Sequence, residues 1–235
     1  MNPPYILQLK TWKMQVKKED FPNWFGQLTD EHWSNVLKNS VCLDYNKNEI
    51  ICKQGAFATN VYFVVSGMLK VYKEYKGENL IMSFVRKGEM FGLSSIYNNE
   101  TNLFSAASLT PATVFSVNIN IIKNQIRVYP DFAEKSIIQL NKEYANTIER
   151  IVSLTQKQLN GRMADAILHF ARNIYGSDEF NMQITRRDMA DFCGMSTESA
   201  IRILKELHND KIISIEGKNV KILNKQQLES LSEFG

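Results

Sequence analysis

The 235-residue sequence contains few residues that could hold a metal or a redox cofactor. It has three cysteines, Cys42, Cys52 and Cys193, which are widely spaced and form no Cys-x-x-Cys pair. Zinc sites and iron–sulfur clusters require several ligands at short spacing, and a disulfide framework requires an even number of cysteines. We therefore expect no metal, no cofactor and no disulfide, and we expect the three thiols to be free and buried.

Long apolar runs are also absent. The longest stretches, such as residues 61–65, are far shorter than the roughly 20 residues that a membrane-spanning helix needs. In the first 18 residues the basic side chains follow a short apolar patch, whereas in a secretory signal they precede it. These features predict a cytoplasmic protein that does not contact a membrane.

The C-terminal part of the chain has no excess of positive charge. The net charge is +3, but residues 159–235 contain ten Lys and Arg against eleven Asp and Glu. Bulk charge therefore gives no support for binding to nucleic acid. Any attraction to DNA must depend on where particular cations lie.

Residues 20–125 have the pattern of a β domain. Glycines at 55, 67, 77, 88 and 92 separate runs rich in Val, Ile, Tyr and Phe. Short strands at such regular spacing, joined by glycine turns, are typical of a sandwich or barrel. The chain before them is expected to be helical from Asp30 onward and to pack against the β domain.

Residues 131–160 predict one long helix followed by a break at Asn160-Gly161, which we expect to act as a hinge. Apolar residues recur at intervals of three or four along one face. They are Ile137, Leu140, Tyr144, Ile148 and Ile151. A matching helix from a second copy would cover this stripe and produce a homodimer; the alternative is that the stripe packs on the chain's own β domain.

Residues 161–235 predict a helix-turn-helix with a wing. A helix over about 162–174 and a loop over 175–181 lead to Thr185, which can cap a helix together with Asp188. Ser196 can cap the next helix, and the turn before it contains Gly194, a residue that tolerates a positive φ. The segment KIISIEGKNVKIL then alternates around a Gly-Lys turn, as a wing hairpin does. An ordinary helical hairpin is the alternative.

The second of these helices has the residues needed to contact double-stranded DNA. Its N-terminal residues Thr197, Glu198 and Arg202 would face base edges in the major groove, where Arg can donate to guanine and Glu can accept from cytosine. Glu198 and Arg202 are four residues apart, so they could also form a surface ion pair that orients the Arg. The residues placed to meet DNA phosphates are Arg186, Arg187, Ser196 and Lys218.

From about Leu43 onward the sequence resembles the CRP/FNR superfamily of transcription regulators. The resemblance rests on KQG, VSG, YKG and RKGEMFG in the β domain, on Gly161-Arg162, and on TRRDMADFCGMSTESAIRILKEL. It implies an α+β chain in three parts. These are a sensor domain over 1–130, built as a cyclic-nucleotide-binding-like jelly roll (β-roll), a dimerisation helix with its hinge over 131–160, and a winged helix-turn-helix over 161–235. It also implies an inverted-repeat operator with TGA in each half-site, and contact with RNA polymerase.

The sequence differs from the family pattern at the effector pocket. After Gly92, the family's ribose-binding Glu is replaced by Leu93, and the phosphate-binding Arg-Ser pair reads Phe104-Ser105. A phosphate facing no cation would be desolvated and unpaired, at a cost of several kcal/mol. Thr147 matches a family position that contacts the purine. The sequence therefore predicts a small-molecule effector other than cyclic AMP or cyclic GMP, or no effector.

Other sensing chemistries and other functions find little support. An oxygen-sensing cluster needs four thiolates, and a haem sensor needs a histidine in the β-roll, but none lies between His32 and His169. The acids at residues 46–125 are five glutamates without ligand-like spacing, so we expect no enzyme. They are Glu49, Glu74, Glu78, Glu89 and Glu100. The remaining alternative is a small-molecule-binding regulatory module that acts through protein partners.

Overall fold

The computed structural model describes residues 16–97 and 101–235, and its contacts divide the chain into two compact units. The first unit is formed by Met1–Lys73 with Ser83–Glu143, and the second by Glu74–Met82 with Tyr144–Gly235. Most of the N-terminal stretch for which we predict no secretory signal lies outside the described residues, as does Glu100.

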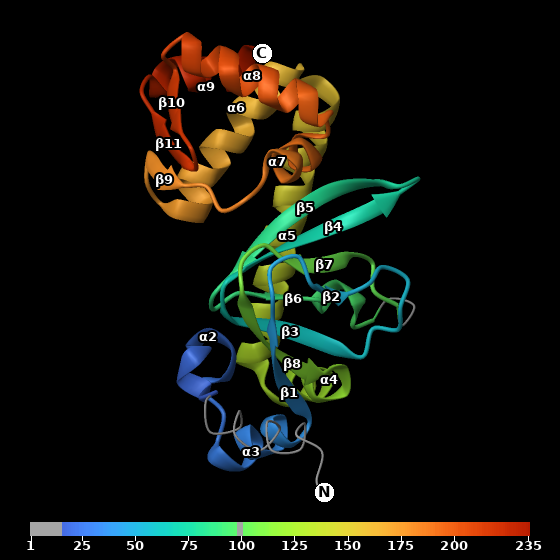
Figure 1. Cartoon of the computed structure of the whole chain (residues 1–235). Coiled ribbons are helices and arrows are strands. Elements are labelled where there is room, and N and C mark those ends of the chain that lie inside the picture. Colours follow the sequence, from blue (N-terminus) through green and yellow to red (C-terminus); the bar gives the residue numbers. More distant parts are fainter. Residues whose placement is uncertain (1–15, 98–100) are drawn as a thin grey trace, which may run out of the picture. The chain divides into compact units, whose positions relative to one another are not determined.

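The first unit is built around a β sandwich of two four-stranded sheets, which confirms the predicted β domain (Figure 1). The strand orders are β1-β8-β3-β6 and β2-β7-β4-β5, and β8 pairs antiparallel with both β1 and β3. The strands are β1 (Ser40–Tyr45), β2 (Ile50–Cys52), β3 (Asn60–Ser66), β4 (Met68–Tyr75), β5 (Glu78–Arg86), β6 (Met90–Phe91), β7 (Ser105–Ser108) and β8 (Ala112–Asn118).

Gly67, between β3 and β4, shows why glycines occur in the turns between strands. Gly67 has a φ of 84°, and a Cβ added there would lie 2.4 Å from the carbonyl oxygen of Pro111. Both the backbone angle and the close approach exclude larger residues. The tight β3–β4 turn therefore depends on glycine.

Helices close one end of the sandwich around an aromatic core. They are η2 (Lys18–Asp20), α2 (Pro22–Phe25), α3 (Asp30–Lys38), η3 (Leu93–Ser95) and α4 (Ile119–Val128). Phe25 of α2 is fully buried, and its ring centroid lies 4.8 Å from that of Phe63 on β3. The helix predicted from Asp30 onward is confirmed, and so is its packing, since Val36 of α3 belongs to the same buried cluster.

The long helix α5 (Pro130–Gln156) ends earlier than predicted, and the expected break at Asn160-Gly161 is wrong. The chain turns at Gln158, whose extended backbone caps α6 (Leu159–His169), and Gly161 lies inside α6. A Cβ at Gly161 would meet the carbonyl oxygen of Gly235 at 2.4 Å. This glycine therefore permits close packing between two segments and is not a hinge.

The second unit contains the helix-turn-helix and its wing (Figure 1). After α6 come η4 (Phe170–Tyr175), β9 (Glu179–Asn181), α7 (Arg186–Cys193), α8 (Thr197–Asn209), β10 (Ile213–Glu216), β11 (Asn219–Ile222) and α9 (Lys225–Phe234). The loop predicted over 175–181 instead contains β9, because Phe180 is buried and pairs with Val220 of the wing. Helix α9, which we did not predict, is anchored by the fully buried Leu228.

Within the described ranges, no helix combines the length and apolarity needed to cross a membrane. The same residues contain no group of three or more His, Cys, Asp or Glu side chains that could hold a metal ion.

Candidate DNA-binding site and effector pocket

The start of α7 is fixed by the capping box that the sequence predicts. The hydroxyl of Thr185 accepts a hydrogen bond from the backbone N–H of Asp188 at 3.0 Å. In return, the Asp188 carboxylate accepts from the backbone N–H of Thr185, also at 3.0 Å. Two of the free N–H groups at this helix end are thereby satisfied.

The turn into α8 also follows the prediction. Gly194 has a φ of 62°, and a Cβ there would lie 2.8 Å from Cδ2 of Leu154. The Ser196 hydroxyl accepts from the N–H of Ser199 at 3.1 Å and so caps α8. With Met189 and Ile203 fully buried between the helices and a wing after them, the alternative of an ordinary helical hairpin is excluded.

The exposed face of α8 presents the predicted base-reading residues. Glu198 and Arg202 are exposed and Thr197 is half-buried. The alternative of an ion pair between Glu198 and Arg202 is not observed, because Nη1 of Arg202 donates instead to Oε1 of Glu206 at 2.8 Å. Glu198 lies in the first turn, where the free N–H groups and the helix dipole favour a carboxylate without help from Arg202.

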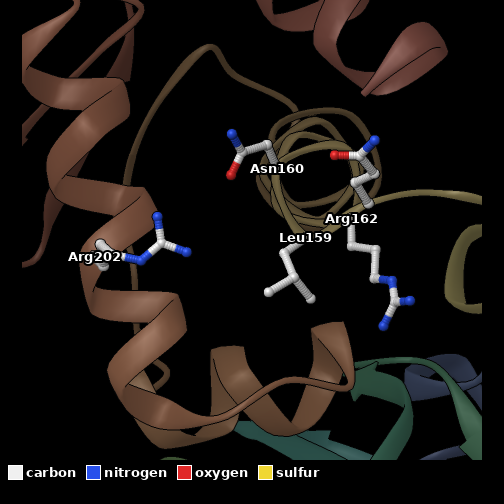
Figure 2. Close-up of a pocket in the computed structure, with 5 residues that line it drawn as sticks. Leu159, Asn160, Arg162 and Arg202 are labelled. Atoms are coloured by element: carbon white, nitrogen blue, oxygen red, sulfur yellow. The ribbon is translucent and has the colours of Figure 1, made fainter.

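Arg202 also borders a cavity of about 440 Å³ that we did not predict. Figure 2 shows its side chain facing the first turn of α6, from which Leu159 and Asn160 project. Arg162 lines the same cavity and is held in place by its Nε, which donates to the carbonyl of Lys157 at 3.0 Å. No sequence motif indicates this juxtaposition, since Arg162 on α6 and Arg202 on α8 are forty positions apart in the sequence.

The four predicted phosphate contacts differ in accessibility. Lys218 is exposed in the wing turn, and Ser196 is exposed although its hydroxyl caps α8. Arg186 is half-buried, its Nη1 lies 3.9 Å from Sδ of Met182, and burial lowers its pKa. The next residue, Arg187, is exposed, so it is the more accessible cation of the pair.

In the sandwich, the predicted effector residues are engaged in the fold. Gly92 adopts a left-handed φ of 99° and caps η3, and Leu93 is buried in the aromatic core. Ser105 is fully buried, and its hydroxyl accepts from the backbone N–H of Gln54 at 3.0 Å. Thr147 lies on α5, within the second unit.

A cation that was not predicted from the sequence lies beside Phe104. Lys73 of β4 places its Nζ 5.7 Å from the centre of the Phe104 ring. The same ammonium donates to the carbonyl of Leu103 at 2.8 Å. Lys73 was missed because it is thirty residues away in sequence and reaches this position only through sheet pairing.

The stripe predicted on α5 is exposed along its whole length in this chain. Ile137 and Ile151 are 59% and 55% exposed, and Leu140, Tyr144 and Ile148 are exposed as well. Ile138 and Val152, which the prediction omitted, are further exposed apolar residues of α5. The alternative that the stripe packs on the chain's own β domain is therefore not supported.

Comparison with known proteins matches both halves of the chain to protein families. Residues 42–129 match the family described as "Cyclic nucleotide-binding domain". Residues 161–231 match the family described as "Crp-like helix-turn-helix domain". The two matches fall on the β sandwich and on the segment that contains α7, α8 and the wing.

Similar proteins align with most of this chain, across both matched segments. The cAMP-activated global transcriptional regulator CRP of Pasteurella multocida is 26% identical over 76% of this chain and 88% of its own length. The anaerobic regulatory protein of Aggregatibacter actinomycetemcomitans is 26% identical over 79% of this chain and 74% of its own. FixK2 from Bradyrhizobium japonicum has a similar fold, with a TM-score of 0.75 and 24% identity over 82% of this chain and 96% of its own. The chain belongs to the CRP/FNR family: it is a DNA-binding transcription regulator, not an enzyme, and it combines a cyclic nucleotide-binding domain with a Crp-like helix-turn-helix.

Proposed function

We propose that the protein binds an inverted-repeat operator as a homodimer, with helix α8 of each chain in the major groove. The observation that carries this proposal is the exposed face of α8. Glu198 and Arg202 project from its first two turns, and the exposed Lys218 lies in the wing of the same unit. This is the arrangement that a winged helix-turn-helix uses to read base edges and bind the adjacent backbone.

Base recognition would come from charged hydrogen bonds. Arg202 can donate two hydrogen bonds to O6 and N7 of guanine, and Glu198 can accept from the amino group of cytosine. Each well-placed pair of this kind contributes about 1 to 3 kcal/mol of discrimination against a wrong base. The TGA half-site implied by the family resemblance supplies a G·C pair that these residues would read.

The α5 stripe supports dimerisation. A contiguous row of exposed apolar side chains on one helix is costly in water and usually marks an interface. A second copy of α5 would bury the row through side chains at intervals of three and four. Two chains related in this way would present two copies of α8 to an inverted sequence.

The effector is proposed to be a molecule other than cyclic AMP or cyclic GMP, or to be absent. Leu93 and Phe104 replace the Glu and Arg that hold the nucleotide in the family, and the Ser105 hydroxyl is already engaged by Gln54. Lys73 is a cation near Phe104, but its ammonium is bonded to the carbonyl of Leu103. Contact with RNA polymerase is a proposal that rests on the family resemblance, and a cytoplasmic location is a proposal that rests on the short apolar runs of the sequence.

Selection of duplexes from a random pool by the full-length protein tests this function. We expect the recovered sequences to share an inverted repeat with a G·C pair in each half. Arg202→Ala should lower the preference for this repeat over random duplex by roughly 1 to 3 kcal/mol. Arg172→Ala, which removes an exposed cation paired with Glu229 outside α8, is the matched control and should keep the preference. Recovery of no common sequence would contradict the proposal.

A further inference from the structure

Helix α8 carries one large apolar side chain on its exposed face. Ile201 is 49% exposed, whereas the other apolar residues of this helix are buried between it and the rest of the unit. Those buried residues are Ala200, Ile203, Leu204 and Leu207. The packing of the helix-turn-helix therefore gives no reason for an isoleucine at 201.

Its position on the helix groups Ile201 with Thr197. Residues four apart lie one above the other on a helix, so the methyl group of Thr197 and the side chain of Ile201 share one row. Glu198 and Arg202 form the neighbouring row over the same two turns. The face of α8 thus presents an apolar row beside a charged row.

We propose that Ile201 is a third base-reading residue, which contacts the C5 methyl group of a thymine in each half-site. In the major groove thymine is the base that presents a methyl group, and apolar side chains recognise it by excluding water from that methyl. Isoleucine has no hydrogen-bonding group, so it cannot read the O6 and N7 acceptors that suit Arg202. The two rows therefore select different base pairs. This inference rests on the proposed function, since it requires α8 to enter the major groove.

Replacement of thymine by deoxyuracil tests the contact, because it removes the methyl group and leaves base pairing intact. In the selected operator, each thymine is replaced in turn, symmetrically in both half-sites, and the dissociation constant of the full-length protein is measured. Burial of one methyl group predicts a loss of about fourfold per half-site, or roughly fifteenfold for the symmetric pair, at one position. At the other positions we expect no loss from this contact.

Variants connect the methyl effect to Ile201. Ile201→Ala should bind the thymine operator more weakly and should no longer distinguish thymine from deoxyuracil at that position. Because the side chain is half exposed, we expect the variant to keep its fold, with a melting temperature close to that of the wild type. Lys205→Ala, which changes an exposed residue one turn further along the same helix, is the matched control and should keep the thymine preference.

Three results would distinguish a failure of the proposed Ile201 contact from a failure of the proposed function. Equal affinity of the wild type for thymine and deoxyuracil at every position overturns the role of Ile201, and so does an unchanged thymine preference in Ile201→Ala. In both cases the operator is still bound, so the proposed function stands. Failure to bind any operator would overturn the proposed function and this inference with it.

Discussion

Arg202 and Glu206 form an ion pair along the exposed face of α8, with Nη1 of the guanidinium 2.8 Å from Oε1 of the carboxylate. This ion pair uses one of the three guanidinium nitrogens, Nη1. Its Nε and Nη2 form no hydrogen bond with any residue in the described part of the chain. These two groups are the fork that could donate to O6 and N7 of guanine, so Glu206 is placed to orient Arg202 without competing for that edge.

Glu206→Gln should separate affinity from specificity. Loss of one negative charge near the DNA should raise the affinity for random duplex a few-fold. An exposed i,i+4 pair contributes about 0.3 to 0.5 kcal/mol, so the preference for the operator should fall about twofold. Competition binding with operator and random duplex measures both effects, and Glu229→Gln, on α9, is the control. An unchanged preference would show that Glu206 does not position Arg202.

Ile151→Glu should convert the proposed homodimer to a monomer. The side chain lies at the C-terminal end of the exposed α5 stripe, and a buried carboxylate facing its own copy would be desolvated and repelled. Val128→Glu, on α4, changes an apolar residue of similar exposure outside the stripe and should leave the dimer intact. Light scattering gives both masses, and a dimeric Ile151→Glu variant would place the interface elsewhere.

Saturating cyclic AMP should leave the melting temperature unchanged. A ligand present at one hundred times its dissociation constant stabilises a protein by about 2.7 kcal/mol, which would raise the melting temperature by several degrees. Because Leu93 is buried in the core and Phe104 replaces the phosphate-binding Arg that the family resemblance implies, we expect no such rise. The cAMP-activated CRP of Pasteurella multocida serves as a positive control. A comparable rise in this protein would show that the pocket accepts the nucleotide.

The three cysteines are free as predicted, but only Cys193 is fully buried, whereas Cys42 and Cys52 are half-buried; all three should still react slowly in the native protein. Burial raises the pKa of Cys42 and Cys52 to about 11 and that of Cys193 to about 12, from an ordinary value of 9.0. At pH 7.5 all three are therefore protonated thiols, which are poor nucleophiles. Ellman's reagent should react slowly with the native chain and label three thiols after unfolding. Rapid labelling of the native protein would contradict this burial.

The same pKa shifts predict how stability depends on pH. The pKa of each thiol is higher in the folded state than in the unfolded state. The thiols therefore make their full contribution to the free energy of unfolding at pH values below 9. This contribution is lost as the pH rises from 9 toward 11 and above, because the thiols ionise in the unfolded chain before they ionise in the folded one. Urea unfolding at pH 8 and pH 10 measures this loss.

Local signals in the sequence were sufficient to predict the helix-turn-helix. Caps and tight turns depend on side chains and backbone angles within a few residues, and for this reason Thr185, Ser196 and Gly194 have the predicted roles. The α5 stripe was predicted for the same reason, because helical periodicity is also local. The exposed Glu198 and Arg202 followed from their places on α8.

Features that depend on distant contacts were not predicted. Gly161 looked like a helix breaker, but its role is set by close packing against Gly235, and β9 forms because the wing offers it a strand to pair with. Lys73 reaches Phe104 through the sheet. The partner of Arg202 could not be settled by spacing, since Glu198 and Glu206 are both four residues away.

The affinity for an operator with one scrambled half-site tests the central claim most directly, namely that two copies of α8 read two halves of one inverted sequence. Each mismatched base pair costs about 1 to 3 kcal/mol, so loss of a whole half-site should weaken binding by at least a hundredfold. The measurement compares the selected operator, the half-scrambled duplex and a fully scrambled duplex at one salt concentration. We predict that the half-scrambled duplex binds far more weakly than the operator. Equal affinity for the intact and half-scrambled duplexes would contradict the account.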